Sequence, residues 1–329
     1  PAGGEVVIAA SPELLAHQLI TGTFEGPEMV SSLTEMARRG ETPQEVSALA
    51  SAFRDASVPV NTVHPVVLDM CGTGGARFRT FNVSSIASFI VSSLGVPVAK
   101  HGNRSNRGCG SADLFEALGT RLMLTPEEAG ASLDSMCFAF LYAPGFHPAM
   151  RYAVPIRREI STRTVFNMLG PLLNPVRSRH RQLLGVYSPQ LLELLPKVVR
   201  DIGTERALLV HGRPGMDEVS VVGPTSAVLV TSDGEERFLI DPRELGLYHP
   251  DPSDICELDP IMSAAAARDI LGGTVGARRD MVVLNAACGL LAYGAVDDLD
   301  RGIRKCEAAI DTGKALAKLN QYVSRFRSL

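Results

Sequence analysis

The sequence predicts an α/β fold: a large domain with a mostly parallel sheet flanked by helices, beside a small all-helical domain. From residue 66 onward, short β-rich runs alternate with helical patterns, as expected for β-α-β units with helices on both faces of a sheet. Before residue 57, apolar side chains recur at helical spacing only. Polar, glycine-rich segments follow several β-rich runs, and ligands bind at that edge of such sheets.

The helical domain is expected to contain three short helices. Ser11 precedes a proline, as a helix N-cap often does, and Gly26-Pro27 and Thr42-Pro43 restart the helical pattern. The predicted domains are residues 1–62, joined by helices from about residues 148–178, and residues 63–329.

The large domain is expected to hold alternating strands and helices, then a hairpin and three closing helices. The expected strands are 66–70, 96–99, 138–142, 183–187 and 207–210, and the helices between them are 84–94, 111–118, 126–136 and 190–202. The hairpin covers 228–240 about Asp233-Gly234, and the closing helices are 263–271, 279–293 and 298–326. Pro196 lies inside one helical pattern, where it kinks or weakens the helix.

Composition narrows the classes of function. Of 329 residues, 45% are hydrophobic and 21% are charged, as in ordinary globular proteins. A net charge of −4 provides no electrostatic footprint for nucleic acid or an anionic membrane, and no apolar run is long enough to span a bilayer. The six cysteines form no Cys-x-x-Cys pair, which argues against structural zinc or disulfides and favours a reducing, cytoplasmic setting.

The strongest local signal is a glycine turn after the first expected strand. Cys71 leads into Gly72-Thr73-Gly74-Gly75, and Asn82-Val83-Ser84-Ser85 then opens a helical pattern. Glycines let the main chain approach a ligand closely, and the N–H groups at a helix N-terminus favour an anion. Strand, turn and helix start together indicate a phosphate site, although a glycine cluster alone is also typical of ordinary turns.

Two further polar segments follow expected strands. Lys100-His101-Gly102-Asn103-Arg104 comes directly after strand 96–99 and continues into Gly110-Ser111, another helix start, so anion binding is favoured over a solvated turn. Asp217-Glu218 lies in a Gly/Pro loop after strand 207–210. Adjacent carboxylates beside a phosphate site suggest Mg²⁺, although such a pair is more often surface charge.

A fourth segment carries a histidine, an aromatic ring and arginines. His147 precedes a proline, Tyr152 follows it, and Arg157-Arg158 come five residues further on. An arginine near aromatic rings can clamp a planar carboxylate ligand, whereas a solvated arginine would need no such neighbour.

These segments, in this order, resemble the anthranilate phosphoribosyltransferases of tryptophan biosynthesis. The resemblance covers nearly the whole chain and is weakest in the N-terminal helices. Its motifs are Gly72-Thr73-Gly74-Gly75, Phe81-Asn82-Val83-Ser84, residues 100–104, residues 110–113, His147-Pro148-Ala149-Met150, residues 163–175, residues 182–187, Asp217-Glu218, residues 276–280, Asn285-Ala286-Ala287 and residues 309–315.

The resemblance implies a fold like that of nucleoside phosphorylases and phosphoribosyltransferases, and a homodimer formed through the helical part. It also implies an Mg²⁺-dependent transfer of 5-phosphoribosyl from phosphoribosyl pyrophosphate to the amine of anthranilate. Metal ions and fixed N–H donors would stabilise the leaving pyrophosphate. Because an aromatic amine is already a usable nucleophile, positioning is favoured over a general base, and none is nominated.

Matched residue by residue, the family pattern implies three sets of contacts. The phosphoribosyl pyrophosphate contacts are Gly72, Thr73, Gly75, Asn82, Ser84, Ser85, Lys100 and Ser111. The Mg²⁺ contacts are Ser84, Asp217 and Glu218. The anthranilate contacts are Asn103, His147, Tyr152 and Arg158, with Arg158 facing the carboxylate.

Two positions depart from the family pattern and keep alternatives open. Ala76 stands where the family normally has aspartate, and residues 105–109 form a shorter loop with fewer hydroxyls, in which Arg107 is a candidate phosphate ligand. The alternatives are an enzyme like the pyrimidine nucleoside phosphorylases and a paralogue that binds a ligand without turning it over.

Overall fold

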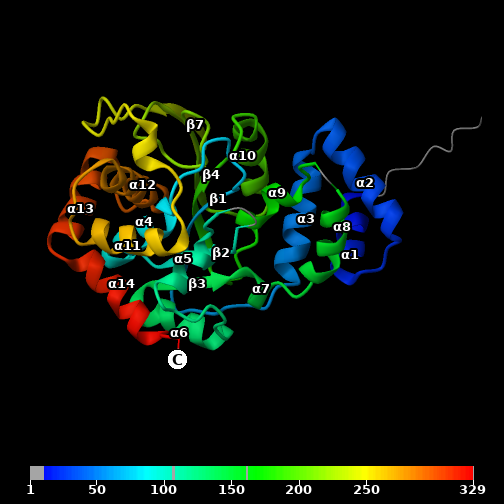
Figure 1. Cartoon of the computed structure of the whole chain (residues 1–329). Coiled ribbons are helices and arrows are strands. Elements are labelled where there is room, and N and C mark those ends of the chain that lie inside the picture. Colours follow the sequence, from blue (N-terminus) through cyan, green and yellow to red (C-terminus); the bar gives the residue numbers. More distant parts are fainter. Residues whose placement is uncertain (1–10, 106–107, 161, 329) are drawn as a thin grey trace, which may run out of the picture.

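The computed structural model describes residues 11–105, 108–160 and 162–328. Its centre is a seven-stranded sheet with the order β3-β2-β1-β4-β5-β6-β7 (Figure 1). The strands are β1 (Val66–Gly72), β2 (Val98–Gly102), β3 (Phe138–Tyr142), β4 (Arg179–Gly185), β5 (Arg206–Gly212), β6 (Thr225–Thr231) and β7 (Gly234–Ile240). Strands β1 to β5 pair in parallel, and β6 and β7 add an antiparallel hairpin at one edge.

The order of the strands reverses at the carboxyl end of β1. The chain builds outward from β1 through β2 to β3, then returns to place β4 on the other side of β1. Ligands in open α/β sheets bind where the strand order reverses in this way. The apolar side chains of β1 are buried on both faces, as in a central parallel strand.

One face of the sheet is covered by helices from the middle and the end of the chain. Helices α4 (Val83–Ser93) and α12 (Ala277–Tyr293) pack on the strands, with α13 (Leu299–Asp311) and α14 (Lys314–Arg325) outside them. Around this layer lie α5 (Ser111–Ala117), α6 (Pro126–Met136), the 3-10 helix η2 (Pro252–Ile255) and α11 (Pro260–Leu271). The predicted covering of the sheet by helices is thus confirmed on this face.

The other face is covered by α10 (Leu191–Asp201), which packs against a helical unit (Figure 1). This unit contains α1 (Pro12–Thr21), α2 (Gly26–Arg39), α3 (Pro43–Asp55), α8 (Met150–Glu159), α9 (Phe166–Leu169) and the 3-10 turn η1 (Gly170–Leu172), with α7 (Ala143–Phe146) leading into it. Phe53 of α3 meets Phe166 of α9 edge to face, with ring centroids 6.2 Å apart. The exact domain boundaries stay a prediction, and residues 1–10 lie outside the described residues.

The predicted element types are confirmed, but several boundaries were wrong. Strand β2 runs to Gly102, so Lys100 and His101 lie inside it and not in a loop after it. Their backbone pairs with Phe140 and Leu141 of β3, which extends the strand although its sequence is polar there. Strand β4 likewise ends at Gly185, two residues before the predicted end.

In the closing part of the chain, α11 and α12 begin at Pro260 and Ala277, a few residues before their predicted starts. The single helix expected over 298–326 is two helices, α13 and α14, because Gly313 takes a φ of 74°, which ends one helix and starts the next. In α10, the helix continues through Pro196. Among the described residues, no helix has the length and apolarity needed to cross a membrane.

Candidate active site

The predicted phosphate turn lies at the carboxyl end of β1. Gly72 closes the strand, and Gly74 and Gly75 follow with φ angles of 68° and 71°, a region that favours glycine. The Thr73 N–H fixes the turn to the neighbouring strand by donating to the Gly185 carbonyl at 2.9 Å. The turn therefore has the backbone shape that allows close approach to a phosphate.

Asp217 and Glu218, in the loop after β5, pass over the ends of β1 and β4. A Cβ atom on Gly72 would lie 2.4 Å from the Asp217 carboxylate, and one on Gly185 would lie 1.7 Å from the Asp217 carbonyl oxygen. No side chain fits at either position, so these two glycines admit the acidic loop. The Asp217 carboxylate accepts a hydrogen bond from the Gly74 N–H at 2.7 Å, which ties the acidic pair to the glycine turn.

The start of α4 and the side chain of Lys100 complete this group. The Ser84 N–H donates to a Glu218 carboxylate oxygen at 3.4 Å, and Ser85 is buried behind it. The Lys100 ammonium donates to the Met70 carbonyl at 2.7 Å and to the Ser84 hydroxyl at 3.3 Å. Lys100 is only 2% exposed, and burial lowers its pKa. A cation, a hydroxyl and two carboxylates therefore meet at one point.

The two carboxylates are poorly neutralised within the protein. Burial, and then the charge of Asp217, raises the pKa of Glu218 to about 8, and burial raises the pKa of Asp217 as well. The described residues contain no cluster of three or more His, Cys, Asp or Glu side chains that could hold a metal by themselves. The pair suits Mg²⁺, which takes one or two carboxylates and completes its shell with water and substrate phosphates.

A second buried group surrounds His101. Its Nδ1 lies 3.2 Å from the Gly170 carbonyl oxygen, and its Nε2 lies 3.2 Å from Nε2 of His147. Because a carbonyl only accepts, the neutral His101 ring donates from Nδ1 and accepts from His147 at Nε2. Burial lowers the pKa of His101 to about 3 and that of His147 to about 4. Both rings are therefore neutral near pH 7, and Nδ1 of His147 has no partner among the described residues.

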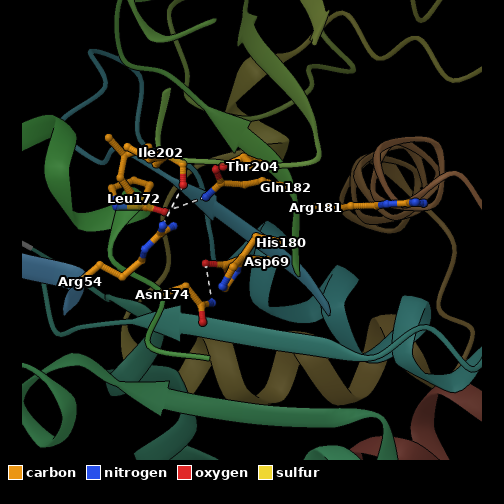
Figure 2. A pocket seen from close by; sticks show the side chains of 10 residues that line it. Arg54, Asp69, Leu172, Asn174, His180, Arg181, Gln182, Ile202 and Thr204 are labelled. Carbon is orange, nitrogen blue, oxygen red and sulfur yellow. Dashed lines mark hydrogen bonds between the residues drawn. The ribbon is translucent and has the colours of Figure 1, made fainter. Parts of the chain in front are cut away.

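Asp69 of β1 connects this group to a narrow pocket (Figure 2). Its carboxylate accepts from the His101 N–H at 3.3 Å and from the Asn174 side-chain amide at 2.9 Å. Burial raises the pKa of Asp69 to about 6. The pocket is also lined by Arg54 and His180 and has room for about one water molecule. It is too small for a substrate and lies where the helical unit meets the sheet.

Asn82 and Ser111 hold the surrounding loops together. The Asn82 side chain donates to the Cys109 carbonyl at 3.1 Å and accepts from the Ser263 hydroxyl at 2.5 Å. The Ser111 hydroxyl donates to the Asn103 carbonyl at 3.3 Å. The starts of α4, α5 and α11 are thereby fixed around the loop that ends at Cys109.

The departures from the family pattern have a structural context. Arg104 is engaged by α5, because its guanidinium donates to Asp113 at 2.8 Å and to Glu116 at 2.7 and 2.8 Å. Arg107 lies outside the described residues. Ala76 is partly buried after the glycine turn, and the carboxylate that contacts this turn comes from Asp217.

The anthranilate contacts expected at His147, Tyr152 and Arg158 are arranged unevenly. Tyr152 packs tightly on Gly22, where a Cβ atom would lie 2.6 Å from its ring, and the Arg151 guanidinium lies 4.6 Å from the ring centroid. Arg158 is exposed. His147 is therefore the residue of this expected set that the structure joins directly to the buried group around His101.

Arg157, the neighbour of Arg158, is exposed as well, but it contacts an aromatic ring of the helical unit. It stands four residues after Ala153, on the stripe of α8 that buries Ala153 and Ile156. Its guanidinium lies 5.3 Å from the Phe166 ring centroid, and burial lowers its pKa. Both arginines are exposed, and Arg157 is the one whose guanidinium lies over the Phe166 ring.

Sequence reasoning missed Arg163 as a site residue. Its guanidinium donates to the Gly75 carbonyl and lies 4.2 Å from the Tyr187 ring centroid, while the Tyr187 N–H donates to the Thr73 hydroxyl at 3.0 Å. Arg163 thus connects the segment after α8 to the glycine turn. Its signal was present, because it opens the 163–175 segment that carried the family resemblance.

Comparison with known proteins agrees with this geometry. Residues 64–316 match the family model of the glycosyl transferase family, a/b domain. An anthranilate phosphoribosyltransferase from Pelotomaculum thermopropionicum is 45% identical over 308 residues, which cover 93% of this chain and 89% of the relative. The chain belongs to the anthranilate phosphoribosyltransferase family.

Solved anthranilate phosphoribosyltransferases share the whole fold. The crystal structure of the Thermus thermophilus enzyme superposes with a TM-score of 0.89 at 36% identity, covering 98% of this chain and 97% of the other. The Saccharomyces cerevisiae enzyme, solved with PRPP and Mg, superposes with a TM-score of 0.84 at 27% identity, covering 95% and 91%. The predicted fold class is confirmed by these likenesses.

Proposed function

We propose that this chain transfers the 5-phosphoribosyl group of phosphoribosyl pyrophosphate to the amine of anthranilate, with Mg²⁺, in tryptophan biosynthesis. The observation that carries this proposal is the meeting of a glycine turn, a helix start, Lys100 and an acidic pair at the carboxyl ends of adjacent parallel strands. Family membership and the yeast complex with PRPP and Mg support it.

The donor side would bind phosphoribosyl pyrophosphate through groups that favour anions. The turn N–H groups and the start of α4 offer hydrogen-bond donors, and Lys100 supplies a nearby positive charge. The proposed contacts are Gly72, Thr73, Gly75, Asn82, Ser84, Ser85, Lys100 and Ser111. Ser84, Asp217 and Glu218 would hold Mg²⁺, which when bound neutralises the charge on the pyrophosphate group.

The acceptor side would hold anthranilate near the neutral histidines. The proposed contacts are Asn103, His147, Tyr152 and an arginine that faces the carboxylate. Sequence nominated Arg158 for this last role, whereas the direction of α8 favours Arg157. The neutral His147 ring would border the anthranilate side through its contact with His101.

The reaction then needs positioning more than acid-base chemistry. The bond from the anomeric carbon to the pyrophosphate oxygen breaks, the amine nitrogen bonds to the same carbon, and one amine proton is lost. Fixed N–H donors on the donor side stabilise charge that develops on the leaving oxygen. Lys100 and the acidic pair hold their places through hydrogen bonds to Met70, Ser84 and Gly74, so little reorganisation is needed.

One assay tests the proposal. Purified protein is mixed with Mg²⁺, phosphoribosyl pyrophosphate and anthranilate, and the loss of anthranilate fluorescence is followed. We expect turnover that stops when a chelator removes Mg²⁺ and resumes when the metal is restored. Absence of turnover at every Mg²⁺ concentration would reject the proposal. Phosphorolysis of thymidine or uridine would favour the phosphorylase alternative, and ligand binding without turnover would favour the inactive paralogue.

We further propose that the chain forms a homodimer through the helical unit and works in the cytoplasm. Helices α1 and α3 border an exposed groove whose lining combines Ala16, Ile20, Ala48 and Ala52 with two serines and with the polar side chains of Glu13, His17, Gln44 and Asp201. All six cysteines are free, as expected for a reducing compartment. The helical domain would comprise residues 1–62 and helices from about 148–178, beside the large domain of residues 63–329.

Sedimentation of the purified protein tests the dimer. We expect the wild-type chain to sediment at twice the monomer mass, and Ala48→Arg to sediment as a monomer because the long charged side chain would occupy the groove. Leu239→Arg is the matched control, since Leu239 is 67% exposed on β7 and lies away from the groove. A dimeric Ala48→Arg variant would contradict this placement of the interface.

A further inference from the structure

We infer that Asn285, in the middle of α12, is a positioning residue that sets the place of the acidic pair Asp217 and Glu218. The inference rests on the proposed function, because it concerns the residues proposed to hold Mg²⁺. Asn285 is fully buried and lies 66 positions from Val219, the residue to which it bonds. The motif Asn285-Ala286-Ala287 is part of the family resemblance, but the resemblance assigned no role to Asn285.

A single side-chain amide satisfies both backbone groups of Val219. The Asn285 Oδ1 atom accepts from the Val219 N–H at 2.9 Å, and Nδ2 donates to the Val219 carbonyl at 2.8 Å. Nδ2 also donates to the Met281 carbonyl one turn earlier in α12, at 2.8 Å. These three bonds fix the orientation of the amide and attach the residue after Glu218 to the helix backbone.

The attachment is needed because this loop is buried. Val219 is fully buried, so its N–H and C=O would be left without hydrogen-bond partners if Asn285 were removed, which destabilises the loop. The next residues are fixed separately: the Ser220 N–H donates to the Thr225 hydroxyl at 2.9 Å, and the Val221 carbonyl accepts from the His249 N–H at 2.9 Å. The Asn285 bonds are therefore the anchor adjacent to the carboxylates.

The same helix also contacts β1, the strand whose Met70 carbonyl accepts a hydrogen bond from Lys100. A Cβ atom on Gly289 would lie 2.9 Å from the Met70 side chain, so α12 packs closely on β1. The Met70 carbonyl in turn accepts from Lys100. One helix therefore sets the distance between the acidic pair and the cation. A shift of the loop at Val219 would also move the Asp217 contact to the glycine turn.

The test compares Asn285→Leu with Asn285→Asp and with Thr120→Val. Leucine has a similar volume without hydrogen bonds, and aspartate keeps the acceptor but directs an oxygen at two carbonyl groups. Thr120→Val is the matched control, because it removes another buried hydrogen bond, which the Thr120 hydroxyl donates at 2.8 Å to the Phe115 carbonyl of the preceding helix α5. Binding of Mn²⁺ in the presence of phosphoribosyl pyrophosphate is measured by electron paramagnetic resonance, together with Mg²⁺ activation curves, KM for anthranilate and melting temperature.

We expect both Asn285 variants to bind Mn²⁺ about 10- to 100-fold more weakly, as for other residues that orient metal ligands. Their activity should recover at high Mg²⁺ with an unchanged KM for anthranilate, while Thr120→Val should melt earlier and bind metal normally. Wild-type metal affinity in a variant that only melts earlier would overturn the inference. If Asn285→Leu does not fold, Asn285→Asp decides by the same criterion. Absence of wild-type turnover would instead count against the proposed function.

Discussion

Arg157 and Arg158 are neighbours in the chain, but α8 directs them about 100° apart. Both side chains are exposed, and the guanidinium of Arg157 lies over the Phe166 ring. We expect Arg157→Ala to raise KM for anthranilate about 10- to 100-fold, because a charge-assisted hydrogen bond to the carboxylate is lost. Arg158→Ala is the control and should leave KM near the wild-type value in initial-rate measurements. A larger effect at Arg158 would support the nomination made from sequence.

At the same scale, a site residue could be predicted from sequence when its chemistry was local. Gly72 and the pair Asp217-Glu218 each follow a strand, and the structure places them together. Asp69 and Asn285 could not be recognised, because their partners are groups in distant segments that meet them only after folding. One sign of these residues is present in the sequence: each is a polar residue inside an otherwise apolar strand or helix pattern.

Among the elements, the ends of β1 and β4 determine whether the acidic loop can lie over the sheet. Gly185 closes β4, and a Cβ atom there would meet the Asp217 carbonyl oxygen at 1.7 Å. We expect Gly185→Ala to displace the loop and lower kcat/KM about 100-fold, the scale expected for a misplacement of about 1 Å. Gly26→Ala is the control, because no atom lies within 4 Å of a Cβ atom at that position. Full activity in Gly185→Ala would show that the loop adapts.

Element types were predictable from alternation, and element ends were not. Lys100 and His101 resemble a polar loop in sequence, yet pairing with β3 keeps them in β2 and buries them. Periodicity likewise continued across Gly313, where one residue with positive φ separates α13 from α14. In both places a tertiary contact or a single backbone angle decided the boundary, and periodicity reports neither.

For the whole molecule, the site depends on where the chain reverses its strand order. The parallel β-α-β units were predictable from the sequence. The pairing of β4 with the edge of β1 opposite β2 was not, because it is decided only when the sheet assembles. That pairing places the ends of β1 and β4 side by side, where the acidic loop passes over both. The helical unit is joined to the end of α10 by Arg54 of α3, whose guanidinium donates to the Ile202 carbonyl at 2.7 Å (Figure 2).

The pocket at this junction makes stability depend on pH through His180 (Figure 2). Burial lowers the pKa of His180 to about 4, whereas an unfolded histidine titrates near 6.5. Above pH 6.5 the ring is neutral in both states, so its contribution to stability is fully present. As the pH falls toward 4, the unfolded chain binds a proton that the folded chain does not, and stability is lost.

We expect His180→Gln to remove this pH-dependent contribution to the free energy of unfolding. Between pH 7 and pH 4, the free energy of unfolding in urea should fall by about 3 kcal/mol less in His180→Gln than in the wild-type chain. The raised pKa of Asp69 acts in the opposite direction, since its folded form gains a proton below about pH 6, but that term is common to both proteins. Parallel pH dependences of the two unfolding free energies would show that the His180 ring gains its proton without unfolding.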